Sequence, residues 1–323
     1  MTRFDNVKSI EFTAKASGWG IVNYNGNDQV SVLKAAGISN SAFFNDDGTF
    51  SKNLRLGKRV FYPIEGTDKY GYHLIVDDKC LRNQMFADTM PFHSNNLMMV
   101  PEIRYRALAN PDLILRGYVF PSKSNTIKRP SALRVESARE VGPLHKNINL
   151  VINTRSGKKE KSEEKKDNTL FYTEKIGEIE YKFTGSIDME ILQFIVADPE
   201  YDRLEIDRLD EDDNEKIYLE SLEKNMINLK PEFKNYTRVG NYLGDAAYER
   251  GVLLNEDSVD MLVKKALTKI LTLKIKRNGS SFEVNTLTVG VVHDGKKDVF
   301  DISLDNLSDY YFGYYHYYQP VEE

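Results

Sequence analysis

Residues 7–16 read Val7-Lys8-Ser9-Ile10-Glu11-Phe12-Thr13-Ala14-Lys15-Ala16, and apolar and polar side chains alternate through most of this stretch. Ile10, Phe12 and Ala14 fall on one side of an extended chain, whereas Glu11, Thr13 and Lys15 fall on the other. A period of two predicts a strand that is half buried in a sheet. The segment that follows ends at Asn25-Gly26, a dipeptide typical of tight turns.

Outward from this stretch, short apolar runs alternate with a few helical patterns. Residues 72–76 predict a strand, and Asp77-Asp78 offer an N-cap for a helix from Lys79 to about Phe86. Residues 113–120 predict a further strand, which we expect to form a hairpin with a return strand at 132–135. Further predicted elements are a strand-like segment over 187–197, helices over 217–229 and 256–271, and strands near 272–277 and 281–293.

This order of elements predicts a single elaborated α+β domain over residues 1–323, built on a sheet that carries long insertions. Residues 25–70 are polar and rich in Gly and Asn, which predicts an irregular insertion. Residues 155–168 contain no apolar side chain, which predicts a mobile charged loop.

Composition narrows the class of protein. The chain has 323 residues, and its 41% hydrophobic content is enough for a buried core. The single cysteine, Cys80, forms no internal disulfide, and neither a signal peptide nor a long apolar span is visible. We therefore expect a cytoplasmic protein that has no membrane partner.

The net charge of -5 hides a strong segregation of charge along the chain. Residues 104–139 hold eight basic and two acidic side chains, and residues 264–277 hold six basic and no acidic ones. Residues 198–215 hold ten acids and two arginines. Such segregation indicates a cationic groove for a polyanion. The alternative interpretation is that each charge run is a solvated face.

Three segments supply candidate binding residues. The basic hairpin carries Arg116, Lys123, Lys128 and Arg129 among short donors such as Ser122, which suit phosphate oxygens. The predicted helix start carries Lys79, Arg82 and Asn83, where backbone N–H groups attract anions. Residues 235–242 place Tyr236 and Tyr242 on either side of Arg238, a pattern suited to stacking a base while a cation holds the backbone. Packing of these tyrosines on a sheet is an equal alternative.

No catalytic motif accompanies these residues. The sequence has no Gly-rich phosphate loop and no Gly-x-Ser-x-Gly motif, and its five histidines form no metal-binding pair at helical spacing. His293-Asp294-Gly295 is the pattern of a β-turn, and the tyrosine-rich stretch 310–318 favours packing over base stacking. We expect no enzymatic activity, no metal site and no cofactor.

An ordered set of segments resembles one protein family. The segments are Lys8-Ser9-Ile10-Glu11-Phe12 with Gly18-Trp19-Gly20-Ile21-Val22-Asn23-Tyr24-Asn25-Gly26, Cys80-Leu81-Arg82 with Phe86, Leu115-Arg116-Gly117-Tyr118-Val119-x-Pro121-Ser122, Lys128-Arg129-x-Ser131, Gly185-Ser186-Ile187 with Leu192-Gln193-Phe194-Ile195, Asp202-Arg203, Asn235-Tyr236-x-Arg238 and Gly251-Val252-Leu253-Leu254-Asn255-x-Asp257. Together they are similar to the Cas-seven-type backbone subunit of the minimal type I-F variant CRISPR Cascade, a member of the RAMP superfamily.

The resemblance implies a fold and a function. The fold is an antiparallel palm like an RNA-recognition motif (ferredoxin-like), with inserted finger, web and thumb elements. The function is a non-enzymatic scaffold that polymerises head to tail along crRNA, next to other Cascade subunits, and presents the spacer to target DNA before a recruited nuclease-helicase cuts. It assigns Arg82, Arg116, Ser122, Lys128, Arg129, Tyr236 and Arg238 to guide RNA, while Lys79, Asn83 and Lys123 join them on chemistry alone.

Two other functions compete with this one. His293-Asp294 and the acidic run suggest a metal-dependent ribonuclease that processes guide RNA. The tyrosine-rich end suggests instead a structural assembly protein whose packing is independent of RNA.

Overall fold

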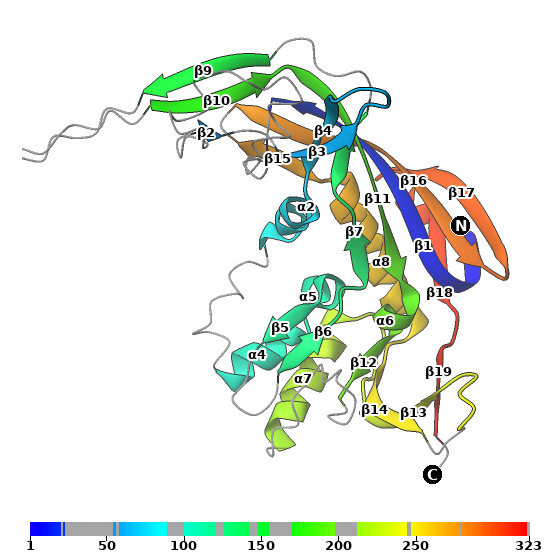
Figure 1. The fold of residues 1–323 in the computed structure, drawn as a ribbon. Coiled ribbons are helices and arrows are strands. Elements are labelled where there is room, and N and C mark those ends of the chain that lie inside the picture. Colours follow the sequence, from blue (N-terminus) through cyan, green and yellow to red (C-terminus); the bar gives the residue numbers. More distant parts are fainter. Residues whose placement is uncertain are drawn as a thin grey trace, which may run out of the picture.

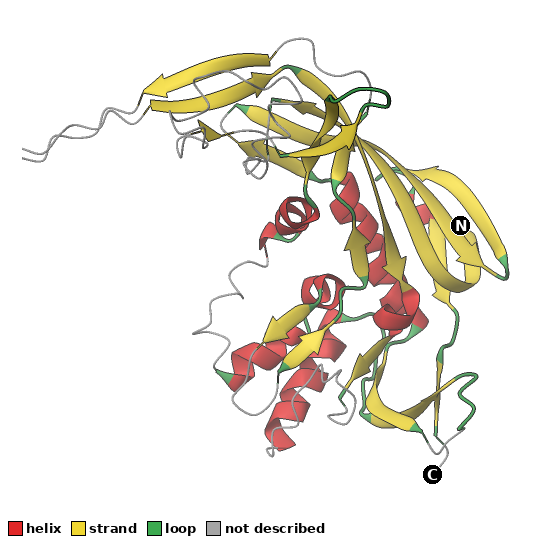
Figure 2. Cartoon of the chain, viewed as in Figure 1, coloured by secondary structure: helices red, strands yellow, loops and turns green. Residues whose placement is uncertain are grey.

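The computed structural model describes residues 1–20, 22, 54–55, 58–88, 100–120, 126–141, 148–154, 170–197, 212–243, 247–277 and 279–321. Its sheets are mostly antiparallel and its helices are few, so the predicted α+β class is confirmed at that level. The ribbon bends as an arc, with an arm of strands at one end and a helical lobe at the other (Figures 1 and 2).

The large sheet forms the middle of the arc. Its main path runs β15 (Lys274–Arg277), β16 (Ser280–His293), β1 (Thr2–Trp19), β11 (Glu178–Asp188), β8 (Ala138–Glu140), β4 (Tyr70–Val76) and β3 (Arg59–Pro63). Three more strands join it: β17 (Lys296–Ile302) pairs with β16, β18 (Tyr310–Tyr314) with β1, and β7 (Leu133–Val135) with β11. Every pair within this sheet is antiparallel except β1 with β18.

Strand β1 confirms the alternation in the sequence and extends it. Ile10, Phe12 and Ala14 are buried, whereas Glu11 and Lys15 are exposed. The buried side faces α8 (Glu256–Leu271), the helix predicted for this segment. Its predicted N-cap is also present, since the Asn255 side chain accepts a hydrogen bond from the backbone N–H of Ser258 at 3.0 Å. The opposite side of the sheet is called the open face below.

Helix α2 (Asp78–Met85) follows β4 as predicted, but the strand predicted over 113–120 is wrong in its first half. Residues there form α5 (Pro111–Arg116), and only β5 (Tyr118–Phe120) is extended. Asn110 caps α5 by accepting from the backbone N–H of Asp112 at 2.8 Å, and Pro111 occupies the first turn, where proline is favoured. The Asn110 cap and Pro111 therefore favour a helix here, although the apolar run itself also suits a strand.

The predicted hairpin is present with a different return strand. Strand β5 pairs with β6 (Ile127–Arg129), whereas the segment predicted as the return joins the large sheet as β7. Gly117, between α5 and β5, has a φ of +72°, and a Cβ there would lie 2.6 Å from the carbonyl oxygen of Arg129. Glycine is therefore needed for the hairpin to lie against the end of α5.

The helical lobe contains α4 (Pro101–Leu108) and α7 (Asp212–Asn225) beside α5 (Figure 1). The strand predicted over 187–197 is interrupted, because Asp188 caps the short helix α6 (Met189–Gln193) before β12 (Phe194–Val196). Strand β12 begins a second sheet in the order β12, β14 (Tyr248–Leu253), β13 (Lys234–Arg238) and β19 (Tyr318–Pro320).

The tyrosine-rich end is used for packing. Tyr314 and Tyr318 are buried, and the Tyr314 hydroxyl donates to the carbonyl oxygen of Leu254 at 2.8 Å. A short 3₁₀ helix, η4 (Leu307–Asp309), precedes β18. Asp294 and Gly295 both have positive φ and form the predicted turn between β16 and β17.

Two predicted segments lie wholly or partly outside the described residues. The charged loop 155–168 falls between β9 (Ile148–Thr154) and β10 (Leu170–Ile176), which pair in a small sheet with β2 (Leu54–Arg55). Most of the polar insertion 25–70 is outside as well. Its last part is not irregular as predicted, since β3 pairs regularly with β4 there.

Candidate nucleic-acid interface

Helix α2 carries the first group of predicted binding residues. Its start is fixed by Asp77, whose carboxylate accepts from the backbone N–H of Cys80 at 2.8 Å and binds the Lys58 ammonium at 2.9 Å. Leu81 and Met85 are buried on one side of the helix. Lys79 and Asn83 are exposed on the other side, and Arg82 is half-buried between the two sides.

Two predicted residues from α2 meet a third from α5. The Arg82 guanidinium donates to the carbonyl oxygen of Arg116 at 2.6 Å, and the Arg116 guanidinium donates to the side-chain oxygen of Asn83 at 3.0 Å. We call Lys79, Arg82, Asn83 and Arg116 the α2–α5 cluster. The structure therefore brings together residues that are far apart in the sequence and that the sequence assigned to one ligand.

The electrostatics of this cluster favour an anion. Burial and the neighbouring positive charge of Arg82 lower the pKa of the Arg116 guanidinium below its ordinary value. The buried Nε of Arg82 has no hydrogen-bond partner among the described residues. Two like charges at short range repel each other, and a phosphate oxygen nearby would relieve this repulsion while accepting bonds from both groups.

A further cation near α2 was missed by the sequence reasoning. Burial raises the pKa of the Cys80 thiol above its ordinary value. The positive charge of Arg277, at the end of β15, acts on the same thiol and partly offsets this increase. Arg277 is exposed. In the sequence, Arg277 was marked only as a member of the basic run 264–277.

The rest of that basic run is largely neutralised by carboxylates. Lys265 and Lys269 both bind Asp112, at 3.3 and 3.1 Å. Lys264 binds Asp260 at 2.8 Å, and Lys274 binds Glu283. The run therefore contributes less free positive charge than its composition indicates.

Arg129 occupies a different environment from the one predicted for an RNA contact. It is only 3% exposed, and its guanidinium donates to the carbonyl oxygens of Ile114, Phe194 and Ile191 at 3.2, 3.1 and 2.6 Å. Arg129 thus ties the hairpin to α5, α6 and β12. Its donors are engaged by the fold, so we leave it out of the candidate interface.

Lys128 and Arg238 border a cavity of about 570 Å³ between the hairpin and the second sheet. Arg238 forms an ion pair with Glu190 at 2.8 Å, and Asp188 lines the same cavity. Mixed charge makes this cavity a weaker anion site than the α2–α5 cluster. Lys128 and Arg238, both predicted to bind RNA, therefore lie at this cavity and not with the four residues of the α2–α5 cluster.

Tyr236 is a core residue rather than an exposed stacking platform. It lies on β13, not in an irregular loop as expected, and is 7% exposed. Its ring packs edge-on against Phe194 at 5.4 Å, and burial raises the pKa of its hydroxyl. Tyr242, in the turn after β13, is 93% exposed and is the ring of this segment that can receive a base.

Ser122 and Lys123 lie outside the described residues, between β5 and β6 in the sequence. Among the described residues, no group of three metal-ligating side chains is close enough to hold a metal ion. The described helices also include none long and apolar enough to cross a membrane. His293 bonds the carboxylate of Asp298 at 2.8 Å beside the β16–β17 turn.

Cations gathered on one part of a fold are the electrostatic feature expected at a site for a polyanion. The sequence profile of one family, described as "Type I-Fv CRISPR-associated protein Cas7fv-like", matches residues 6–316. The chain therefore belongs to the Cas7fv-like family, as its resemblance to the type I-F variant backbone subunit predicted.

Solved structures and curated proteins add little beyond this assignment. A chain of a structure titled "CRISPR RNA-guided surveillance complex, pre-nicking" aligns at 8% identity with a TM-score of 0.39, covering 88% of this chain and 77% of that one. A chain of a structure titled "CRISPR RNA-guided surveillance complex" aligns at 9% identity with a TM-score of 0.35, covering 88% and 70%. No curated protein matches the sequence.

Proposed function

We propose that this chain is a backbone subunit of a type I-Fv Cascade complex, which polymerises along crRNA and binds the RNA backbone independently of sequence. The observation that carries the proposal is the α2–α5 cluster, in which Arg82 and Arg116 lie side by side in a chain of the Cas7fv-like family. The protein acts as a scaffold and not as an enzyme.

The chemistry of the cluster suits sequence-independent binding. Guanidinium groups form paired bonds with phosphate oxygens, and the Asn83 amide offers a further donor beside them. Contacts to phosphates position a strand but do not discriminate bases, which is what a scaffold for arbitrary spacers requires. Tyr242 adds a stacking surface, because every base has a π-face.

The strand order supports an RNA-recognition-motif-like palm. Strand β1 is followed by α2, β8 and β11, then by α8 and β16, and these strands lie side by side as β16-β1-β11-β8. This is the order of a βαββαβ unit in which the first and third strands are central. In our proposal the remaining elements are the finger, web and thumb insertions.

The proposed partners follow from this role. Copies of the chain associate head to tail along the crRNA, next to other Cascade subunits, and the exposed spacer pairs with target DNA. A recruited nuclease-helicase then cuts the DNA. A head-to-tail contact that does not close on itself generates a helical filament. We propose a cytoplasmic location for this assembly.

The experiment is purification of the protein from cells that also express a CRISPR array. The absorbance ratio at 260 and 280 nm and the size on a gel-filtration column are measured before and after ribonuclease and high salt. We expect a large RNA-containing species that dissociates on treatment. A large species that contains no RNA and ignores salt would support an RNA-independent assembly protein instead.

A second arm tests the ribonuclease alternative. Purified protein is incubated with precursor guide RNA and Mg²⁺ or Mn²⁺, and the RNA is examined on a denaturing gel. We expect the RNA to stay intact, because the scaffold role requires binding alone. Cleavage that disappears with a chelating agent would replace the scaffold proposal.

A further inference from the structure

The open face of the large sheet carries three cations on neighbouring strands. Lys15 of β1 lies directly opposite Lys182 of β11, and Lys182 lies directly opposite Arg139 of β8. All three are exposed, and each is flanked in its strand by buried residues, so their side chains project from the open face. We call these three residues the cation row.

Cross-strand neighbours have Cβ atoms about 5 Å apart, and like charges in such positions destabilise a sheet. Among the described residues, no carboxylate forms an ion pair with Lys15, Lys182 or Arg139, although the exposed Glu180 lies two residues before Lys182. The fold therefore maintains an unfavourable arrangement of charge that an anionic ligand would make favourable.

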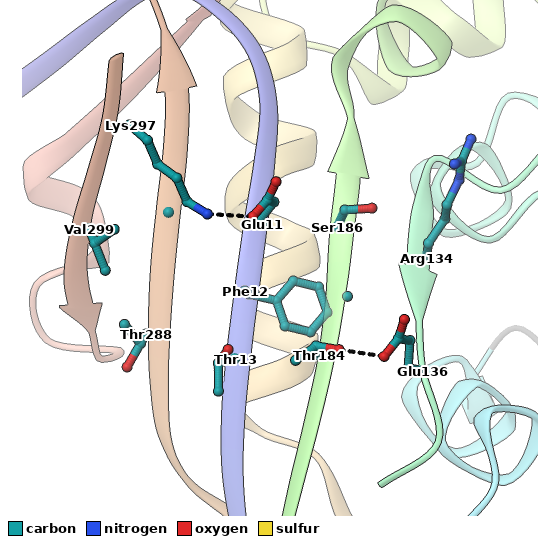
Figure 3. Close-up of a pocket in the computed structure, with 12 residues that line it drawn as sticks. Glu11, Phe12, Thr13, Arg134, Glu136, Thr184, Ser186, Thr288, Lys297 and Val299 are labelled. Atoms are coloured by element: carbon teal, nitrogen blue, oxygen red, sulfur yellow. Dashed lines mark hydrogen bonds and ion pairs between the residues drawn. The ribbon is translucent and has the colours of Figure 1, made fainter.

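Three other cations on the same face are paired with carboxylates. Lys297 binds Glu11 at 2.5 Å, Lys274 binds Glu283 at 2.5 Å, and Arg134 binds Asp188 at 3.1 Å. Figure 3 looks onto this face next to the cation row, with α8 behind the strands, and shows the Lys297–Glu11 contact. The cation row differs from these three residues because its members form no ion pair with a carboxylate of the described residues.

The dimensions and surroundings of the row indicate the ligand. Strands lie about 4.8 Å apart, so three successive strands span about 10 Å, which is longer than one phosphate group. Thr13 and Thr184 occupy the next positions on one side, whereas Ser17, Glu180 and the exposed Val141 occupy those on the other, so hydroxyl groups border the row on the Thr13 side. Hydroxyl groups beside cations suit the phosphates of a strand.

We infer that the cation row binds a single strand of nucleic acid that crosses the sheet over β1, β11 and β8, separate from the strand held by the α2–α5 cluster. The two surfaces are distinct, because the α2–α5 cluster belongs to helices whereas the row projects from the open face, away from α8. This strand is bound through its phosphates and without base discrimination.

The test uses a fluorescent, mixed-sequence single-stranded DNA that is not complementary to the guide, titrated with the purified assembly at several salt concentrations. The variant combines Lys15→Gln, Lys182→Gln and Arg139→Gln. The control combines Lys274→Gln, Lys297→Gln and Arg134→Gln, which removes the same charge from paired cations of the same face. We expect weaker binding by the row variant and a salt dependence of the logarithm of affinity that is flatter by about 0.7 for each phosphate that the variant no longer neutralises.

Retention of guide RNA is measured in the same preparations. We expect both triple variants to retain as much RNA as the unmodified assembly. Equal DNA binding by the row and control variants would overturn the inference, and so would loss of guide RNA from the row variant, because the row would then belong to the first site. If the unmodified protein carries no RNA but the row variant still loses DNA binding, the proposed function fails and the row remains a nucleic-acid site.

Thermal unfolding provides a second, binding-independent measurement. Because Lys182 lies between two like charges, we expect Lys182→Gln to raise Tm by about 1 °C. A lower Tm would mean that the cation supports the fold, and would overturn the inference. A change in assembly size without a change in DNA binding would assign the row to a protein partner instead.

Discussion

Arg116 and Arg129 lie on either side of the same hairpin, yet the fold uses their guanidinium groups differently. Arg129 is buried and donates to three backbone carbonyl oxygens from three elements. Arg116 is half-buried at the end of α5, beside a second guanidinium and a side-chain amide. A basic residue in the sequence is therefore a poor candidate for ligand contact where, as at Arg129, its guanidinium is buried among backbone carbonyl groups.

The largest effect is expected from removing the buried arginine. Arg129→Met should lower the free energy of unfolding by about 3 kcal/mol, because buried carbonyl oxygens would be left without their donors. Arg116→Met should cost less than about 1 kcal/mol, since that side chain is partly solvated. Urea denaturation followed by circular dichroism measures both values. Equal decreases would remove the distinction between the two arginines.

The next effect concerns RNA binding. Arg82→Gln combined with Arg116→Gln should flatten the salt dependence of guide-RNA affinity by about 1.4, or about 0.7 for each phosphate that is no longer neutralised. The matched control is Arg106→Gln with Lys216→Gln, which removes two exposed cations of the helical lobe. Fluorescence anisotropy at several salt concentrations gives the slopes. A control slope that falls as much would mean that total charge, and not the cluster, determines binding.

Two tyrosines differ as the two arginines do, because Tyr236 is buried and Tyr242 is exposed. Tyr242→Ala should weaken RNA binding by about 1 kcal/mol, the lower end of what stacking of one base contributes. Tyr236→Leu should leave the RNA affinity of the folded protein unchanged, because the ring of Tyr236 is buried against Phe194. Both are measured by the same anisotropy titration. A loss of affinity in Tyr236→Leu, with Tyr242→Ala unchanged, would reverse these two assignments.

The smallest effect tests the position of Arg277. Its positive charge favours the Cys80 thiolate, so Arg277→Gln should raise the pKa of that thiol further. The thiolate is the reactive form, and labelling by a thiol reagent at mildly alkaline pH should therefore slow. Lys276→Gln is the matched control on the neighbouring residue. Unchanged labelling in Arg277→Gln would place that charge away from α2.

Local sequence patterns were sufficient to predict much of the fold. The period of two in residues 7–16, the Asp77 cap and the Asn255 cap each depend on neighbouring residues, and all three are present in the structure. The segment 113–120 failed because its apolar run suits both a strand and a buried helix, and the signals that decide between them, Asn110 and Pro111, lie just before it.

The site was harder to predict than the fold. Which cation faces outward depends on tertiary contacts, such as the carbonyl oxygens that receive Arg129 or the ring that packs on Tyr236. No local pattern records those contacts. The cation row could not be predicted from the sequence either. Lys15, Lys182 and Arg139 become neighbours only through the pairing of β1 with β11 and of β11 with β8.

Photochemical cross-linking of guide RNA that contains 4-thiouridine, followed by mass spectrometry of the cross-linked peptides, tests the central claim most directly. The account predicts cross-links in peptides that contain Lys79 to Asn83 and Arg116, and none in the peptide that contains Arg129 but not Lys128. Cross-links confined to α4 and α7, with the α2 and Arg116 peptides unmodified, would contradict it.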